Sequence, residues 1–234
     1  MSGRLKKWIA ELIGTCILVV IGCGAAAAGA GYVGTSLAFG ISIIFVAYSV
    51  GRISGGHVNP AVSLGVFING GMDWIDLIGY IVSQLIGAIA GSALLGAMLG
   101  SYKSTGANVV GILDKNGDPI LWAAFVAEIV LTFLFVLAVL GITSKKEESS
   151  LGGLLIGGAL AGAHLVGFGI DGTSVNPARG LSAAIFAAIG GDKTSLGQSW
   201  IYTIAPLIGG ALAGLLWRFV FKKDVEGEPA PKEA

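Results

Sequence analysis

Apolar residues form long blocks along this chain, and the charged residues lie almost wholly between the blocks. A helix that crosses the hydrocarbon core of a bilayer needs about 20 such residues. The pattern therefore predicts six membrane-spanning helices, near residues 8–30, 35–53, 75–100, 119–143, 152–169 and 199–221. A soluble helical bundle is disfavoured, because its helices would need polar outer faces and these segments show almost none.

Two shorter apolar stretches, 62–69 and 179–189, each follow an Asn-Pro-Ala motif. About 10 helical residues, at 1.5 Å each, cover only half of the ~30 Å hydrocarbon core. Proline suits the first position of a helix, and asparagine suits the N-cap that precedes it. We therefore expect two half-helices, which begin at the motifs Asn59-Pro60-Ala61 and Asn176-Pro177-Ala178.

The two halves of the chain, about 4–100 and 119–221, repeat each other at an offset of 117 residues that later grows to 122. Each half holds three predicted spans, an odd number, so the second copy must enter the membrane from the opposite side. Such an inverted repeat brings its two short segments to the midplane of the bilayer from opposite faces. The matching segments include Ala10-Glu11-Leu12 with Ala127-Glu128-Ile129, Gly40 with Gly157, Val58-Asn59-Pro60-Ala61 with Val175-Asn176-Pro177-Ala178, Tyr80 with Tyr202, and Gly87 with Gly209.

Basic residues indicate how the spans are oriented. They cluster before the first span, between the fourth and fifth, and after the sixth, whereas the other loops carry only Lys103, Lys115 and Lys193. The positive-inside bias therefore predicts that both termini lie in the cytoplasm. A cleaved signal peptide is disfavoured, because the first apolar run is too long for one. The polar segment 224–234 is expected to be a disordered cytoplasmic tail.

Composition excludes several classes of function. Of the 234 residues, 54% are hydrophobic and 12% are charged, and the formal net charge of zero gives no indication of a nucleic-acid partner. With two His and two Cys, no nucleophile–base pair or cluster of metal ligands stands out, so we predict no enzyme activity, no metal and no cofactor. Cys16 and Cys23 both fall in the first span and are expected to pack there rather than form a disulfide.

The paired motifs and the repeated glutamates resemble the aquaporin (major intrinsic protein) family, over about residues 4–223. The resemblance implies an all-α membrane protein with one transmembrane domain, residues 1–223, built as a right-handed bundle of six helices plus two re-entrant half-helices. It implies a passive channel in the cell membrane that conducts water and excludes protons and ions. It also implies a homotetramer with one pore per subunit, which nothing in this sequence shows independently.

Two helix N-termini that face each other at the midplane would place partial positive charge at the centre of the pore. The side-chain amides of Asn59 and Asn176 are then expected to donate hydrogen bonds to a passing water, which interrupts the water chain that could carry protons. The segments before the motifs, 54–57 and 171–174, are expected to be extended backbone that is buried or lines a wet cavity. The predicted pore-facing carbonyls belong to Gly55, Gly56, His57, Gly172 and Ser174.

The resemblance further implies an outer constriction of four side chains, each located by its distance from a motif. The bulky Phe and His would narrow the pore to about one water, the His and Arg would donate hydrogen bonds, and the Arg charge would repel cations. A Phe in a span is, taken alone, more often a packing residue. The four are Phe39, twenty residues before Asn59; His164 and Thr173, twelve and three before Asn176; and Arg179, directly after the second motif.

This set favours the water-selective branch of the family. The glycerol-conducting branch has a small residue in place of His164 and an aromatic residue in place of Thr173. It also has an Asp and a basic residue where this chain has Gly180 and Ala184. One departure keeps permeation by glycerol, hydrogen peroxide or ammonia open: water channels usually have Trp in the sixth span where Thr203 stands.

Glu11 and Glu128 are repeat-related carboxylates inside predicted spans. Paired intramembrane carboxylates can form proton relays, and an inverted-repeat secondary transporter would need ionisable groups of this kind. The resemblance implies a structural role instead, in which each carboxylate accepts hydrogen bonds from the backbone of a re-entrant loop. The structural role is favoured, because the sequence places no basic partner for a relay near either glutamate.

Overall fold

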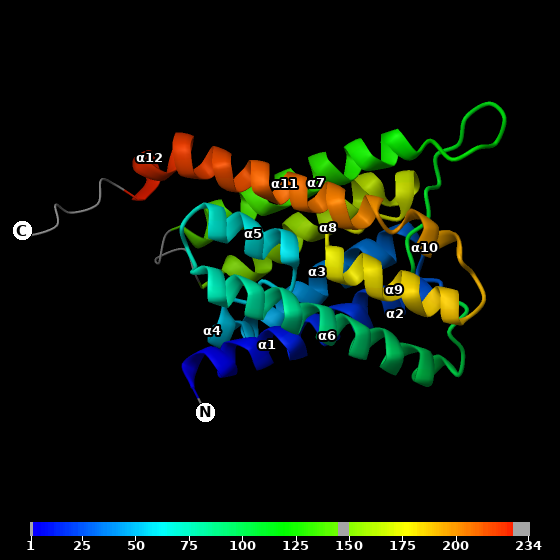
Figure 1. Cartoon of the computed structure of the whole chain (residues 1–234), viewed down its shortest axis with the longest axis horizontal. Coiled ribbons are helices and arrows are strands. Elements are labelled where there is room, and N and C mark those ends of the chain that lie inside the picture. Colours follow the sequence, from blue (N-terminus) through cyan, green and yellow to red (C-terminus); the bar gives the residue numbers. More distant parts are fainter. Residues whose placement is uncertain (1, 145–149, 227–234) are drawn as a thin grey trace, which may run out of the picture.

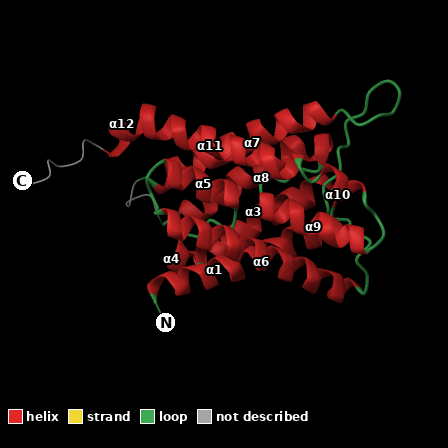
Figure 2. Ribbon diagram, viewed as in Figure 1, coloured by secondary structure: helices red, strands yellow, loops and turns green. Residues whose placement is uncertain are grey.

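A computed structural model describes residues 2–144 and 150–226 of the chain. Figure 1 shows long helices that run side by side along the longest axis of the molecule. Within the described ranges the chain is otherwise loop, with one isolated bridge between Leu113 and Pro119 (Figure 2). The elements are α1 (Gly3–Leu18), the π-helical η1 (Val19–Cys23), α2 (Gly24–Ala27), α3 (Gly31–Tyr48), α4 (Gly51–Ser54), α5 (Pro60–Ile68), α6 (Trp74–Leu99), α7 (Leu121–Thr143), α8 (Gly152–Asp171), α9 (Pro177–Ile189), α10 (Thr194–Gln198), α11 (Ile201–Leu216), the π-helical η3 (Trp217–Phe221) and α12 (Lys222–Glu226).

Six helical runs of the described chain are long and apolar enough to cross a bilayer, which confirms the predicted fold class. The start of α1 and the end of α12 lie at the same end of the bundle, as an even number of crossings requires (Figure 1). The runs are Gly3–Ala27, Gly31–Tyr48, Trp74–Leu99, Leu121–Thr143, Gly152–Asp171 and Thr194–Phe221.

Several predicted boundaries lie four or five residues from those in the structure, and two of them have a clear local cause. The first helix begins at Gly3 rather than near residue 8, because the side chain of Ser2 caps it. The second span ends at Tyr48 rather than near residue 53, and the short helix α4 follows it. Gly51 permits the tight turn between them, since a Cβ there would lie 2.9 Å from the carbonyl oxygen of Val46.

The two half-helices, α5 and α9, enter the bundle from opposite ends and begin at the prolines of the motifs (Figure 1). Asn59 Oδ1 accepts a hydrogen bond from the backbone N–H of Ala61 at 2.8 Å, and Asn176 Oδ1 accepts one from Ala178 at 3.1 Å. With 9 and 13 residues, neither helix can cross the core. Each asparagine is therefore the N-cap that the motif predicts.

The internal repeat is visible in the packing of glycines. A Cβ on Gly87 of α6 would lie 2.2 Å from a carbonyl oxygen of α1, and one on Gly209 of α11 would lie 2.4 Å from the equivalent carbonyl of α7. Where α3 crosses α8, a Cβ on Gly40 or on Gly157 would lie 2.6 Å from the carbonyl oxygen of the other glycine. Gly40 and Gly157 thus bring the two halves into backbone contact, whereas Gly87 and Gly209 each bring together two helices of the same half.

This crossing gives a test of the fold. Gly40→Ala should destabilise the bundle by roughly 1–3 kcal/mol, because the added methyl group must push α3 away from α8. The unfolding temperature of the purified protein in detergent measures the effect. Gly158→Ala is the control: a Cβ there meets nothing within 4 Å, so the unfolding temperature should stay level or rise. Equal effects of the two substitutions would contradict the close crossing.

The loops before the half-helices are not extended, so that prediction was wrong. Gly55 and Gly56 have φ of 93° and 64°, and Gly172 and Thr173 have φ of 77° and 47°. The chain must reverse from the end of one helix into the start of the next within a few residues, and left-handed residues make that turn. The β-branched Thr173 is unfavourable in this conformation.

The structure also bears on the predictions for the two cysteines and for the C-terminal segment. Both cysteines, Cys16 and Cys23, are free, as predicted. The backbone remains helical in α12 to Glu226, into the segment expected to be disordered. The rest of that predicted tail, 227–234, lies outside the described residues, as does the loop segment 145–149.

Candidate functional site: a pore through the bundle

The two half-helices are joined at the centre of the bundle by a reciprocal pair of hydrogen bonds. Asn59 Nδ2 donates to the carbonyl oxygen of Val175 at 2.7 Å, and Asn176 Nδ2 donates to that of Val58 at 2.8 Å. Each amide group carries two N–H donors, so one donor per asparagine remains for another partner. Both asparagines line the cavity at the middle of the bundle.

The repeat-related glutamates hold the loops that precede the half-helices. Glu11 and Glu128 are fully buried, and each accepts two hydrogen bonds from backbone N–H groups at 2.5 to 2.9 Å. A buried carboxylate with several donors of this kind is compensated without a basic partner. The donors are His57 and Val58 for Glu11, and Ser174 and Val175 for Glu128.

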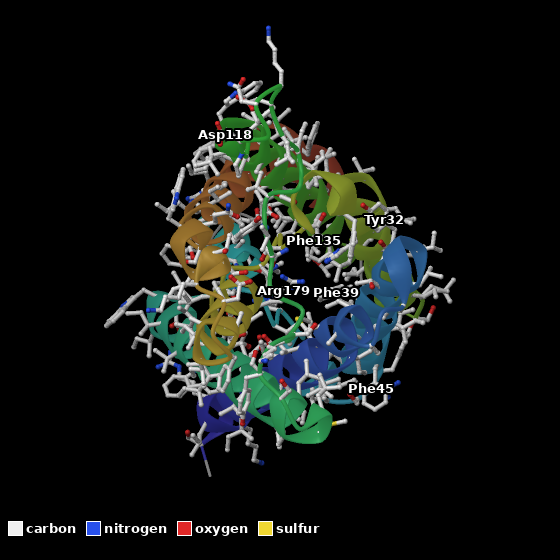
Figure 3. The ribbon with its side chains drawn as sticks, turned by 90° about the vertical axis from the view of Figure 1, so that its right-hand side faces the viewer. Tyr32, Phe39, Phe45, Asp118, Phe135 and Arg179 are labelled. Carbon is white, nitrogen blue, oxygen red and sulfur yellow. The ribbon has the colours of Figure 1, made fainter. Side chains whose placement is uncertain are left out.

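Of the four residues predicted for the outer constriction, Phe39 contacts two others, His164 and Arg179. The rings of Phe39 and His164 stack with centroids 4.2 Å apart and an interplanar angle of 21°. The guanidinium carbon of Arg179 lies 4.9 Å from the centroid of the Phe39 ring. Viewed along the bundle axis, Phe39 and Arg179 lie near the centre, whereas Phe45 lies on the outer surface (Figure 3). All three constriction side chains are buried.

The polar atoms of this cluster are one hydrogen-bond acceptor, on His164, and several donors, on Arg179. His164 Nδ1 lies 3.0 Å from the carbonyl oxygen of Leu160, which can only accept, so the neutral ring carries its proton on Nδ1. The neutral ring then offers Nε2 as an acceptor, whereas the sequence predicted a donor. Nε2 of His164 and Nε and Nη1 of Arg179 have no hydrogen-bond partner among the described residues. Buried polar atoms without a protein partner can be satisfied by a water or another small ligand.

Three hollows follow one another along the bundle, and α3 shows their order. Tyr32, near the start of α3, lines a hollow of about 400 Å³, called the outer hollow here, and Arg179 lines it too. Phe39, at its middle, lines a narrow cavity in which the centre of a water molecule can occupy about 10 Å³. Tyr48, at its end, lines an inner hollow of about 750 Å³. The middle volume is that needed for about one water.

The re-entrant loops follow this path from hollow to hollow. Gly172 lines the outer hollow, His57 and Ser174 line the middle cavity, and Gly55 lines the inner hollow. Gly56, also predicted to face the pore, lines none of these three. Thr173, predicted for the constriction, also lines none of these three, although its neighbours Gly172 and Ser174 line the outer hollow and the middle cavity.

Residues 1–217 match the sequence profile of the family described as Major intrinsic protein. The chain belongs to this family. It is 40% identical over 226 residues to Aquaporin Z of Rhodopseudomonas palustris, which covers 91% of this chain and 92% of that protein. It is 39% identical over 230 residues to Aquaporin Z of Photorhabdus laumondii, covering 93% of this chain and 98% of that one.

Comparison of solved structures gives the same fold. The aquaglyceroporin from Plasmodium falciparum superposes with a TM-score of 0.81 at 21% sequence identity, covering 95% of this chain and 98% of that one. At this identity the likeness establishes the architecture of the major intrinsic protein family and not the solute.

The structure also adds residues that the sequence did not single out for this major intrinsic protein. Gln84, buried in α6, donates to Glu11 Oε2 at 2.7 Å and to Ser63 Oγ at 2.9 Å. The repeat-related Tyr80 and Tyr202 donate from their hydroxyl groups to the backbone at the ends of α4 and α8. A buried amide in an apolar span was the available signal for Gln84, since such a group is unfavourable without partners.

Gly22 of the π-helical segment η1 makes room for the ring of Phe39. A Cβ on Gly22 would lie 2.3 Å from two carbon atoms of that ring. Gly22→Ala should therefore press Phe39 into the constriction and lower the water permeability of vesicles roughly fivefold, if about 1 kcal/mol of overpacking appears in the barrier. Gly24→Ala, where a Cβ would meet Leu95 at 3.4 Å, is the control. Equal permeability of the two variants would contradict this role.

Proposed function

We propose that this major intrinsic protein is a passive channel that conducts water along an osmotic gradient and excludes protons and ions. The observation that carries the proposal is the cavity of about one water enclosed by Phe39, His164 and the two motif asparagines. Its wall combines apolar side chains with a few unpartnered polar atoms, as a pathway for a small neutral molecule requires. Four relatives with 37–40% identity carry the name Aquaporin Z.

At the outer constriction, the stacked rings of Phe39 and His164 set the width. A water that passes beside these rings accepts a hydrogen bond from Arg179 and donates one to Nε2 of His164, so its lost hydration is replaced. A cation meets the charge of Arg179 in a site of low dielectric and cannot keep its hydration shell. Thr173 belongs to the same constriction as a small polar residue of the re-entrant loop.

At the midplane, the free N–H donors of Asn59 and Asn176 bind the oxygen of a single water. That water cannot at the same time accept a hydrogen bond from its neighbour, so the chain of waters along which protons would move is interrupted. The facing N-termini of α5 and α9 add partial positive charge there and oppose cations a second time. Carbonyls of the re-entrant loops accept from waters on either side of this point.

Water is favoured over glycerol by the residue at position 164. A small residue there would leave space beside Phe39, whereas the imidazole ring stacks on the phenyl ring at 4.2 Å. The solved aquaglyceroporin shares the fold at 21% identity, so it does not argue for glycerol in this chain.

The proposal also covers the location of the chain in the cell membrane, its orientation and its assembly. The chain is a multi-pass membrane protein with six spans, and its basic loops favour cytoplasmic termini in the cell membrane. Apolar side chains cover the outer surface of the bundle, for example Phe45 and Leu134, which are about half exposed. Such a surface suits lipid and further copies of the chain, and a homotetramer with one pore per subunit follows from the family resemblance.

Purified protein in lipid vesicles tests the channel. After an osmotic shock, light scattering should report faster shrinkage than in protein-free vesicles, with a rate proportional to the gradient. An inverted-repeat transporter would instead show uptake that saturates and depends on an ion gradient. Shrinkage no faster than in protein-free vesicles, with the protein folded and inserted, would contradict the proposal.

A further inference from the structure

Asp171 is a buried carboxylate beside the outer constriction to which the proposed function gives no role. It is the last residue of α8 and is fully buried. Its position is unfavourable for two reasons, because the membrane interior disfavours charge and the C-terminal end of a helix carries partial negative charge. Its Oδ2 atom has no hydrogen-bond partner among the described residues. A residue placed in this way needs a compensating function.

The internal repeat shows which hydrogen bond of Asp171 has a counterpart in the first half of the chain. At the offset of 117, the counterpart of Asp171 is Ser54, the last residue of α4. Ser54 Oγ accepts a hydrogen bond from the backbone N–H of Gly56 at 3.1 Å, and Asp171 Oδ1 accepts the equivalent bond from Thr173 at 2.9 Å. Both re-entrant loops therefore use a side-chain acceptor two residues before a left-handed residue.

The two loops differ in the residue whose backbone N–H group bonds to that acceptor. Gly56, with φ of 64°, adopts the left-handed conformation without steric cost, and the Ser54 hydroxyl beside it also donates to Glu11 Oε1 at 2.7 Å. Thr173, with φ of 47°, is β-branched and disfavours the same conformation. A carboxylate is the stronger acceptor for a backbone N–H group. The change from hydroxyl to carboxylate thus accompanies the change from glycine to threonine.

Further contacts fix both residues in place. The carbonyl oxygen of Asp171 accepts from the Tyr202 hydroxyl at 3.1 Å and, at the longer distance of 3.5 Å, from Asn108 Nδ2 of the loop between α6 and α7. A Cβ on Gly167 would lie 2.4 Å from Thr173 Oγ1, so the threonine side chain packs directly on α8. Asp171 is thereby a rigid support for the loop.

We propose that Asp171 is a positioning residue of the outer constriction, where its carboxylate holds Thr173 in the left-handed conformation and so keeps the pore too narrow for glycerol. The inference rests on the proposed function, since it takes Thr173 as part of the constriction.

The test separates the acceptor from the charge. Asp171→Asn and Asp171→Ser keep an acceptor and remove the charge, whereas Asp171→Ala removes both. In vesicles we expect the Ala variant to raise the ratio of glycerol to water permeability roughly fivefold, the factor for one net hydrogen bond of about 1 kcal/mol. The Asn and Ser variants should stay within about twofold of the original chain. A purely structural role would lower the amount of folded protein without moving this ratio.

Two results would overturn the inference. One is an unchanged ratio in Asp171→Ala, and the other is an equal rise in all three variants, which would assign the effect to charge. If Asp171→Ala does not reach the membrane, Thr173→Gly is added, since glycine takes positive φ without support. Recovery of folded protein with a glycerol-to-water ratio equal to that of Thr173→Gly alone then supports the role, and no recovery, or a higher ratio, contradicts it. Water flux of the unaltered chain in the same experiment tests the proposed function separately.

Discussion

Arg179→Val is expected to raise the proton or cation conductance of vesicles that contain the protein at least about tenfold. A unit charge 4 Å away opposes a cation by about 4 kcal/mol at an effective dielectric constant of 20, which corresponds to ~10³-fold. The facing half-helices remain as a second barrier, so we expect less than the full factor. Electrical recording from planar bilayers, or a pH-sensitive dye inside vesicles, measures the change.

Arg179→Lys is the matched control for this substitution. Lysine keeps a positive charge but lacks the planar fork of donors, so cation exclusion should be largely retained while water permeability changes. The valine variant should also fold, because a cation at the N-terminal end of α9 is not favoured by the helix dipole. A conductance in Arg179→Val equal to that of the original chain would contradict the barrier assigned to this residue.

The double substitution Phe39→Ala with His164→Gly is expected to convert the channel into one that admits glycerol. Both rings that stack across the constriction are removed, so the limiting width no longer depends on them. We expect glycerol permeability to rise at least about tenfold while water permeability remains within a few-fold of its original value. Light scattering of vesicles in a glycerol gradient, and then in a gradient of an impermeant solute, measures the two quantities.

Phe45→Ala provides the control on the same helix. Its side chain faces the outer surface of the bundle (Figure 3) and is 55% exposed, so its loss should leave both permeabilities unchanged. The single variants should show intermediate glycerol permeability, since each leaves one ring in place. If the double variant excludes glycerol as well as the original chain does, the constriction lies elsewhere in the pore.

Much of this architecture could be predicted from the sequence, because the decisive signals are local. A proline after a capping residue marks where a helix begins, so Pro60 and Pro177 located both half-helices. The offset of 117 residues required their opposite orientation. Phe39, His164 and Arg179 could be located only through the family resemblance, and the structure brings these three into contact.

The sequence could not predict the features that depend on backbone conformation. Val58, Thr173 and Val175 have φ near 46°, which no propensity of β-branched residues indicates; the surrounding hydrogen bonds impose it. The donor pattern of His164 depends on the distance from Nδ1 to a carbonyl one turn away. The bond that Asp171 accepts from Thr173 depends on the same left-handed turn, so the sequence does not indicate it.

We predict that the unaltered channel admits water and excludes glycerol, and a single stopped-flow experiment measures both. Vesicles that contain the unaltered protein are exposed in a stopped-flow instrument first to an impermeant osmolyte and then to glycerol. We predict rapid shrinkage in the first case and, in the second, glycerol entry close to that of protein-free vesicles. Glycerol entry at a rate comparable with water efflux would contradict this prediction.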